Sequence, residues 1–150
     1  MSADTYLLAL RMLARRELSE AQVRQRLARR GEDQDSIDDA IARLKTERSI
    51  DDERVAGAIA RTQATGRKRG RRRVLQQIEA AGIAKSIASR AVDDVFQDLD
   101  PDALLTASLS KRLRGRERIA DDKEFQRLFR YLSAQGFESD RILAQLRKLQ

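Results

Sequence analysis

This chain of 150 residues lacks several residue types that commonly build catalytic or metal sites. It has no cysteine, histidine or tryptophan, which excludes disulfides, thiolate nucleophiles, imidazole bases and most zinc sites. Proline occurs once and aromatic residues make up only 4% of the chain. No apolar run approaches the roughly 20 residues of a membrane span, and the N-terminus does not resemble a signal peptide. We therefore expect a helix-rich cytoplasmic protein with no membrane contact, cofactor or enzymatic activity.

Positive charge is concentrated in the middle of the chain. Residues 54–90 carry ten Lys or Arg and one acid, a net charge of +9, whereas the whole chain carries +7. Residues 1–53 sum to −2, from ten cations and twelve acids, and residues 91–150 sum to zero, from eleven of each. Residues 66–73, which we call the basic segment, hold six cations in eight positions. A patch this localised indicates a surface for phosphates or an acidic partner more than an ordinary solvated helix face.

Three glycines mark an internal repeat. Gly31, Gly82 and Gly136 are 51 and 54 residues apart, and each follows a helical pattern with aliphatic residues four and eight positions earlier. A glycine that ends a helix adopts the left-handed conformation without steric cost. The aliphatic residues are Leu27, Ile78 and Leu132, then Val23, Val74 and Leu128, and the next apolar periods begin at Ile37, Ile87 and Ile142. The pattern predicts an all-α fold of three tandem three-helix repeats, residues 1–50, 51–99 and 100–150, stacked into an extended curved rod.

Nine helices account for this pattern. They are expected near residues 4–16, 19–30 and 35–47, then 52–65, 69–81 and 85–97, then 101–114, 122–135 and 139–149. Ser19 and Gln22 have the spacing of a capping box, and Asp100 precedes Pro101 in the arrangement that starts a helix. Further caps are expected at Asp51, Asp121 and Ser139. No segment alternates polar and apolar residues for long enough to indicate a strand.

The basic segment is the candidate functional surface. Arg71, Arg72 and Arg73 fall in the first turn of a predicted helix, where cations oppose the macrodipole at about 0.3–1 kcal/mol each. This mismatch favours a role in binding an anionic ligand. Arginine outnumbers lysine five to one, which favours bidentate contacts with phosphates or carboxylates. The predicted binding residues are Arg61, Arg67, Lys68, Arg69, Arg71, Arg72 and Arg73, with Arg24, Arg29 and Arg30 as an extension for which a solvated helix face is the alternative.

No aromatic residue interleaves with the basic segment. Proteins that read single-stranded bases usually stack them on aromatic side chains. We therefore expect contacts to the nucleic-acid backbone, without base preference and with strong salt dependence. Three Asp pairs, at residues 51–52, 93–94 and 121–122, leave a magnesium-dependent nuclease as a weaker alternative, because two of the pairs are explained as helix caps.

Three segments resemble the RecX family of regulatory proteins. They are residues 13–27 followed by Arg30 and Gly31, residues 42–56, and residues 70–78 followed by Gly82 and Ile83. The resemblance implies three-helix repeats and a partner in the filament that the recombinase RecA forms on single-stranded DNA. It also implies inhibition of RecA's ATP hydrolysis and strand exchange, and binding to single-stranded and also double-stranded DNA by the protein itself. A monomer is the expected state, and the family usually has aromatic residues where this chain has Ser49 and Val55.

Two other functional classes remain as alternatives. A helix-turn-helix regulator that reads duplex DNA would also combine three-helix units with a basic helix. Three repeats of that kind would be expected to carry three basic recognition helices, whereas only the middle repeat is strongly basic. A purely structural helical adaptor would need an exposed apolar stripe, which the sequence does not identify.

Overall fold

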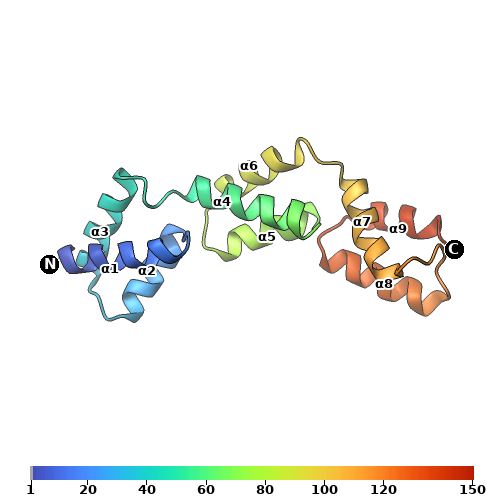
Figure 1. Cartoon of the computed structure of the whole chain (residues 1–150), viewed down its shortest axis with the longest axis horizontal. Coiled ribbons are helices and arrows are strands. Elements are labelled where there is room, and N and C mark those ends of the chain that lie inside the picture. Colours follow the sequence, from blue (N-terminus) through green and yellow to red (C-terminus); the bar gives the residue numbers. More distant parts are fainter. Residues whose placement is uncertain (1) are drawn as a thin grey trace. The chain divides into compact units, whose positions relative to one another are not determined.

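The computed structural model describes residues 2–150, and the side chains from residue 4 onward, as an all-helical protein (Figure 1). The first repeat contains α1 (Ser2–Arg15), α2 (Glu20–Arg29) and α3 (Gln34–Thr46). The second contains α4 (Asp52–Arg61), a π-helical turn η1 (Thr62–Gly66), α5 (Arg71–Ala80) and α6 (Lys85–Phe96). The third contains α7 (Pro101–Leu113), α8 (Asp122–Ala134) and α9 (Ser139–Arg147). Because residues 2–150 contain no strand and all the expected helices, the predicted fold class is confirmed.

Four of the five side-chain caps expected from the sequence are present. Ser19 and Gln22 form the reciprocal capping box at α2. Asp51, Asp100 and Asp121 accept hydrogen bonds from backbone amides of the following turn. The prediction for Ser139 is wrong, because Ser139 is already the first residue of α9 and Glu138 before it makes no side-chain cap bond. None of the described helices is both long enough and apolar enough to cross a lipid bilayer.

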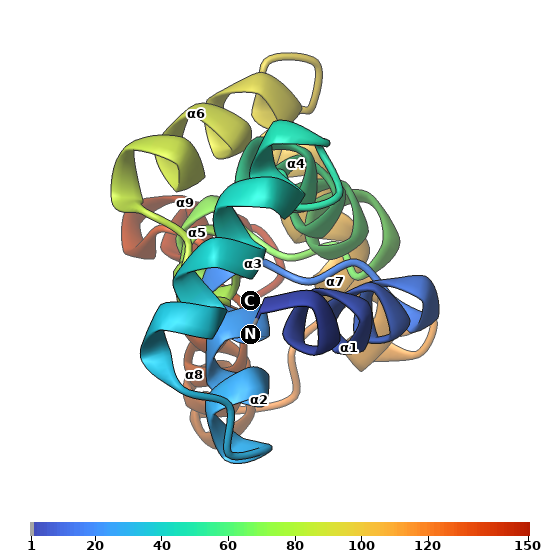
Figure 2. The ribbon, with the colours of Figure 1, turned by 90° about the vertical axis from the view of Figure 1, so that its left-hand side faces the viewer.

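The first and third repeats each have their own hydrophobic core. In the first repeat α1, α2 and α3 all contact one another, as the end-on view in Figure 2 shows. In the third repeat α7, α8 and α9 do the same. The aliphatic residues four and eight positions before each glycine are buried: Leu27, Ile78, Leu132, Val23, Val74 and Leu128. The repeat pattern in the sequence therefore marks positions that face a core.

The contacts divide the chain into two compact units, and the division runs through the middle repeat. One unit extends to Ala56 and includes Ile78–Ala88, and the other contains Gly57–Gln77 and Ser89–Gln150. Helix α5 therefore begins in one unit and ends in the other. The repeat boundaries at residues 50 and 99, and the stacking into a curved rod, stay predictions. Of the two positions where the family usually has aromatics, Val55 is buried and Ser49 is half-buried.

Two of the repeat glycines lie against the middle helix of the preceding repeat. Gly82 has φ +78°, and a Cβ atom placed on it would lie 2.5 Å from the Cβ of Ala21 in α2. Gly136 has φ +100°, and its Cβ would lie 2.3 Å from the backbone nitrogen of Arg73 in α5. Gly31 has φ +86° and would meet nothing within 4 Å. Gly82 and Gly136 are thus needed for close approach as well as for backbone conformation, whereas the sequence predicted only the conformation.

Hydrogen bonds fix both of these junctions. The Ser19 hydroxyl donates to the Ala81 carbonyl at 2.5 Å, which joins the start of α2 to the residue that follows α5. The Gly70 N–H donates to the Gln135 carbonyl at 2.8 Å, which joins the residue before α5 to the residue that follows α8. At each junction the positive end of one helix dipole meets the negative end of another, an arrangement that is electrostatically favourable.

Candidate functional site

The backbone of the basic segment is held in a defined conformation. It follows η1, a turn that the sequence predicted as a continuation of α4. Lys68 has φ +55°, and its carbonyl accepts a hydrogen bond of 2.9 Å from the buried Ser108 hydroxyl of α7. Arg69 donates from its N–H to the Gln63 carbonyl at 3.1 Å and from its guanidinium to the Gln63 side chain at 2.7 Å. The segment therefore presents its remaining side chains from a fixed loop.

Two arginines in the first turn of α5 are engaged by the end of α8. The Arg72 guanidinium donates to the Ser133 carbonyl at 2.6 Å, and the Arg73 guanidinium donates to the Ala134 carbonyl at 3.0 Å. These carbonyls carry the negative end of the α8 macrodipole, which favours nearby cations. The unfavourable position at the start of α5 is therefore compensated within the protein. The dipole mismatch seen in the sequence does not require a ligand to explain it.

The other predicted residues of this region divide into side chains with partners and side chains without partners. Arg71 forms an ion pair with Asp93 of α6, and its guanidinium lies 6.0 Å from the centre of the Phe96 ring. Burial, together with the nearby Arg73 and Arg67 cations, lowers the pKa of Arg69. Among the predicted cations of the middle repeat, those whose side chains make no hydrogen bond or ion pair within residues 4–150 are Arg61, Arg67 and Lys68. Among the residues predicted to bind, these three therefore offer the unengaged charge of the middle repeat.

The arginines predicted on the second helix lie on two different surfaces. Arg24 pairs with Glu20 at 3.0 Å and with Asp38 at 2.6 Å. The hydrogen bond to Asp38 is the main cause that raises the pKa of Arg24. Arg24 therefore belongs to a paired, solvated helix surface, which was the alternative for these residues. Arg29 and Arg30 instead line a cavity on the other side of the helix.

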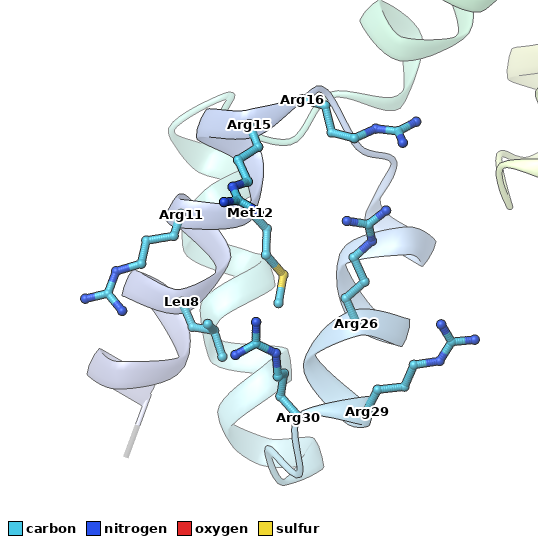
Figure 3. Close-up of a pocket in the computed structure, with 8 residues that line it drawn as sticks. All are labelled: Leu8, Arg11, Met12, Arg15, Arg16, Arg26, Arg29 and Arg30. Atoms are coloured by element: carbon cyan, nitrogen blue, oxygen red, sulfur yellow. The ribbon is translucent and has the colours of Figure 1, made fainter.

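Six arginines line this open cavity of about 890 Å³ between α1 and α2 (Figure 3). They come from α1, from the connection after it and from the end of α2, and they are Arg11, Arg15, Arg16, Arg26, Arg29 and Arg30. Leu8 and Met12 complete the lining, which contains no acidic residue. None of the six guanidinium groups forms an ion pair or a hydrogen bond with any residue from 4 to 150. We call this feature the arginine cavity.

The first repeat separates its paired and unpaired charges. Glu20 binds Lys45 of α3 at 3.0 Å in addition to Arg24, and Glu47 binds Arg43 at 3.0 Å. Several of its acids thus pair on other surfaces, and none lines the cavity. Four of the six cavity residues were not predicted from the sequence, because a net charge of −2 over residues 1–53 conceals this separation. The available signal was the spacing of four between Arg11 and Arg15, which places both side chains on one helix face.

No cluster of three or more acidic side chains suited to a metal ion occurs in the part of the chain that the structure describes. Asp51 and Asp121 cap helices, and Asp93 is bound to Arg71. These roles account for one member of each Asp pair noted in the sequence. The nuclease alternative therefore gains no support from the arrangement of these carboxylates.

The fold and the exposed cations together define a class, the all-helical repeat proteins with arginine-rich surfaces. Residues 6–44 match the family model for the first three-helix domain of RecX. The chain is 36% identical over 138 residues to Regulatory protein RecX of Syntrophotalea carbinolica, covering 91% of this chain and 90% of that protein. It is 32% identical to Regulatory protein RecX of Halorhodospira halophila, covering 91% and 82% of the two chains. The chain therefore belongs to the RecX family of regulatory proteins, which are not enzymes, and the resemblance noted in the sequence is confirmed.

The fold agrees with solved structures of the family. The crystal structure of RecX from Lactobacillus salivarius superposes with a TM-score of 0.78 at 21% identity, covering 98% of this chain and 95% of that one. A second crystal structure of regulatory protein RecX gives a TM-score of 0.76 at 20% identity, covering 98% and 71%. At these identities the likeness concerns the fold.

Proposed function

We propose that this protein is a negative regulator of the recombinase RecA. It binds along or at the end of the RecA filament on single-stranded DNA and inhibits ATP hydrolysis and strand exchange. Family membership over 91% of the chain is the observation that carries the proposal. The protein acts in the cytoplasm as a monomer. It contacts the backbone phosphates of DNA, without base preference.

The geometry of the basic segment supports a role in this binding. Its loop is fixed by Ser108 and Gln63, so the exposed Arg67 and the half-buried Lys68 lose little backbone freedom when they bind. These cations meet either DNA phosphates or acidic groups of RecA. Inhibition follows when the regulator binds one state of the filament more tightly than the states that RecA must pass through.

The test is a titration of RecA's single-strand-dependent ATP hydrolysis at physiological salt. Inhibition is expected well below one regulator per RecA protomer, because a bound regulator blocks filament growth. The variant Arg67→Glu with Lys68→Glu is expected to inhibit much less. Arg71, Arg72 and Arg73 are unsuitable for this purpose, because they hold α5 to α6 and α8.

The matched control is Lys123→Glu with Arg130→Glu, which reverses two exposed charges on α8. It changes the net charge by the same amount and is expected to inhibit like the parent protein. Full inhibition by the folded Arg67/Lys68 variant would reject the basic segment as the contact. Retained DNA binding without any effect of the parent protein on ATP hydrolysis would reject RecA regulation and favour a duplex reader.

A further inference from the structure

We propose that the arginine cavity of the first repeat binds the phosphate backbone of nucleic acid. The inference deepens the proposed function, because it assigns the DNA contact of the regulator to α1 and α2. It is tested with DNA alone, so that its failure is separate from a failure of RecA regulation.

The lining of the arginine cavity contains no counter-charges. Arginine stays ionised at every physiological pH, so cations that share a cavity without acids repel one another. The same repeat neutralises Arg24, Arg43 and Lys45 with nearby carboxylates. Leaving this one surface without acids therefore costs stability that an anionic ligand would restore.

Helix dipoles account for only part of the arrangement. Arg15, Arg26 and Arg29 lie in the last turns of α1 and α2, where a cation is stabilised by the nearby carbonyls. Arg11 lies one turn earlier in α1, and Arg16 lies beyond its end. The dipoles also give no reason for both walls to lack acids. A common ligand of the two walls accounts for all of these positions.

The charges of the arginine cavity recur along both of its walls. Arg11 and Arg15 on α1, and Arg26 and Arg30 on the facing wall, are each four residues apart, a rise of about 6 Å along the helix. In Figure 3 the Arg30 side chain points from the end of α2 into the space between the two helices. Cations repeated along both walls suit a ligand with repeated negative charges better than one small anion.

The lining favours nucleic acid over an acidic protein segment. The centres of protein interfaces are enriched in aromatic residues as well as in Arg and Met, and they bury much apolar surface. The cavity offers only Leu8 and Met12 as apolar surface, both half-buried, and no aromatic side chain. Phosphate contacts need cations and little apolar area, and binding without stacking shows no base preference.

The experiment measures the affinity for a fluorescein-labelled 30-nucleotide oligo(dT) by anisotropy between 50 and 200 mM NaCl. Two variants, Arg26→Gln/Arg29→Gln and Arg11→Gln/Arg15→Gln, each remove two charges from one wall. Each lost single-strand phosphate contact lowers the slope of log affinity against log salt by about 0.7, so each variant is expected to lower it by about 1.4. Far-UV circular dichroism confirms that the variants retain their helices.

Lys123→Gln with Arg130→Gln is the matched control, since it removes two exposed charges outside the cavity. It is expected to leave the slope unchanged, and an equal decrease in this control would show a general charge effect and overturn the proposal. Unchanged slopes in both cavity variants would also overturn it. So would the binding of a fluorescein-labelled poly-glutamate peptide by a protein that does not bind oligo(dT), which would identify an acidic protein segment as the ligand. Inhibition of RecA does not enter any of these outcomes.

Discussion

Replacing Gly136 with alanine tests the junction between α5 and α8. The new Cβ would lie 2.3 Å from the backbone nitrogen of Arg73, 2.5 Å from its Cβ and 2.9 Å from its Cα. Because two of these three atoms are backbone atoms, a side-chain rotation cannot relieve the contact and the first turn of α5 must move. Gly31→Ala is the matched control, since Gly31 has a similar positive φ and open space around it.

Both substitutions lower stability through the left-handed backbone conformation, but only Gly136→Ala also overpacks its surroundings. A left-handed conformation costs an alanine about 1–2 kcal/mol in either position. Overpacking at Gly136 adds about 1–3 kcal/mol. Displacement also weakens the hydrogen bonds from Gly70 N–H to Gln135 and from Arg72 N–H to the Gly136 carbonyl, each worth about 1 kcal/mol. We expect about 3–5 kcal/mol of destabilisation for Gly136→Ala and about 1–2 kcal/mol for Gly31→Ala.

Urea unfolding followed by far-UV circular dichroism measures this difference. Hydrogen exchange of the Gly70 amide shows whether the loss of stability arises at the junction between α5 and α8, because that amide donates across the junction. The exchange rate is expected to rise in Gly136→Ala and to stay unchanged in Gly31→Ala. Equal unfolding midpoints for the two variants would refute the reasoning, since backbone conformation would then be the only role of Gly136.

Two further predictions concern Gly82 and Glu124. Gly82→Ala should destabilise the protein by about 2–4 kcal/mol in urea unfolding, through backbone strain and overpacking. Adding Ala21→Gly should recover part of this loss, because it removes the Cβ atom that lies 2.5 Å away. Failure to recover any stability would contradict the contact. Arg116 and then the Ala120 N–H lower the pKa of Glu124 to about 2, so its stabilising effect is complete above the unfolded pKa near 4.3 and is lost as the pH falls through 2. The difference in unfolding midpoint between the parent and Glu124→Gln should therefore shrink between about pH 5 and pH 2, and a constant difference would exclude this ionisation as its source.

The helices and their order were predictable because their signals are local. Apolar spacings of three and four residues, glycine stops and capping residues act within one or two turns, and Ser19 with Gln22 shows this at α2. The π-helical turn before the basic segment was missed, since it has no comparable local pattern. The predicted end of that helix consequently lies four residues beyond the observed end at Arg61.

The candidate site was less predictable, because it depends on residues far apart in the chain. The partners of Arg72 and Arg73 lie 61 residues away, so sequence alone could not show that α8 engages these cations. The cavity charge was hidden for a related reason. Summing over a segment cannot distinguish arginines paired with carboxylates, such as Arg24, from unpaired ones such as Arg26.

The two glycine junctions look alike in the sequence but are chemically different. Gly82 fits against an alanine methyl beside the Ser19 hydroxyl, whereas Gly136 fits against the backbone of Arg73 and the Gly70 amide. The repeats are therefore not interchangeable modules. In a chain with its second and third repeats exchanged, the Gly136 loop would meet the start of α2, which fits Gly82, and the Gly82 loop would meet the start of α8, where no repeat glycine packs in the described residues. The order of the repeats is therefore specified by their contacts and not only by their covalent linkage.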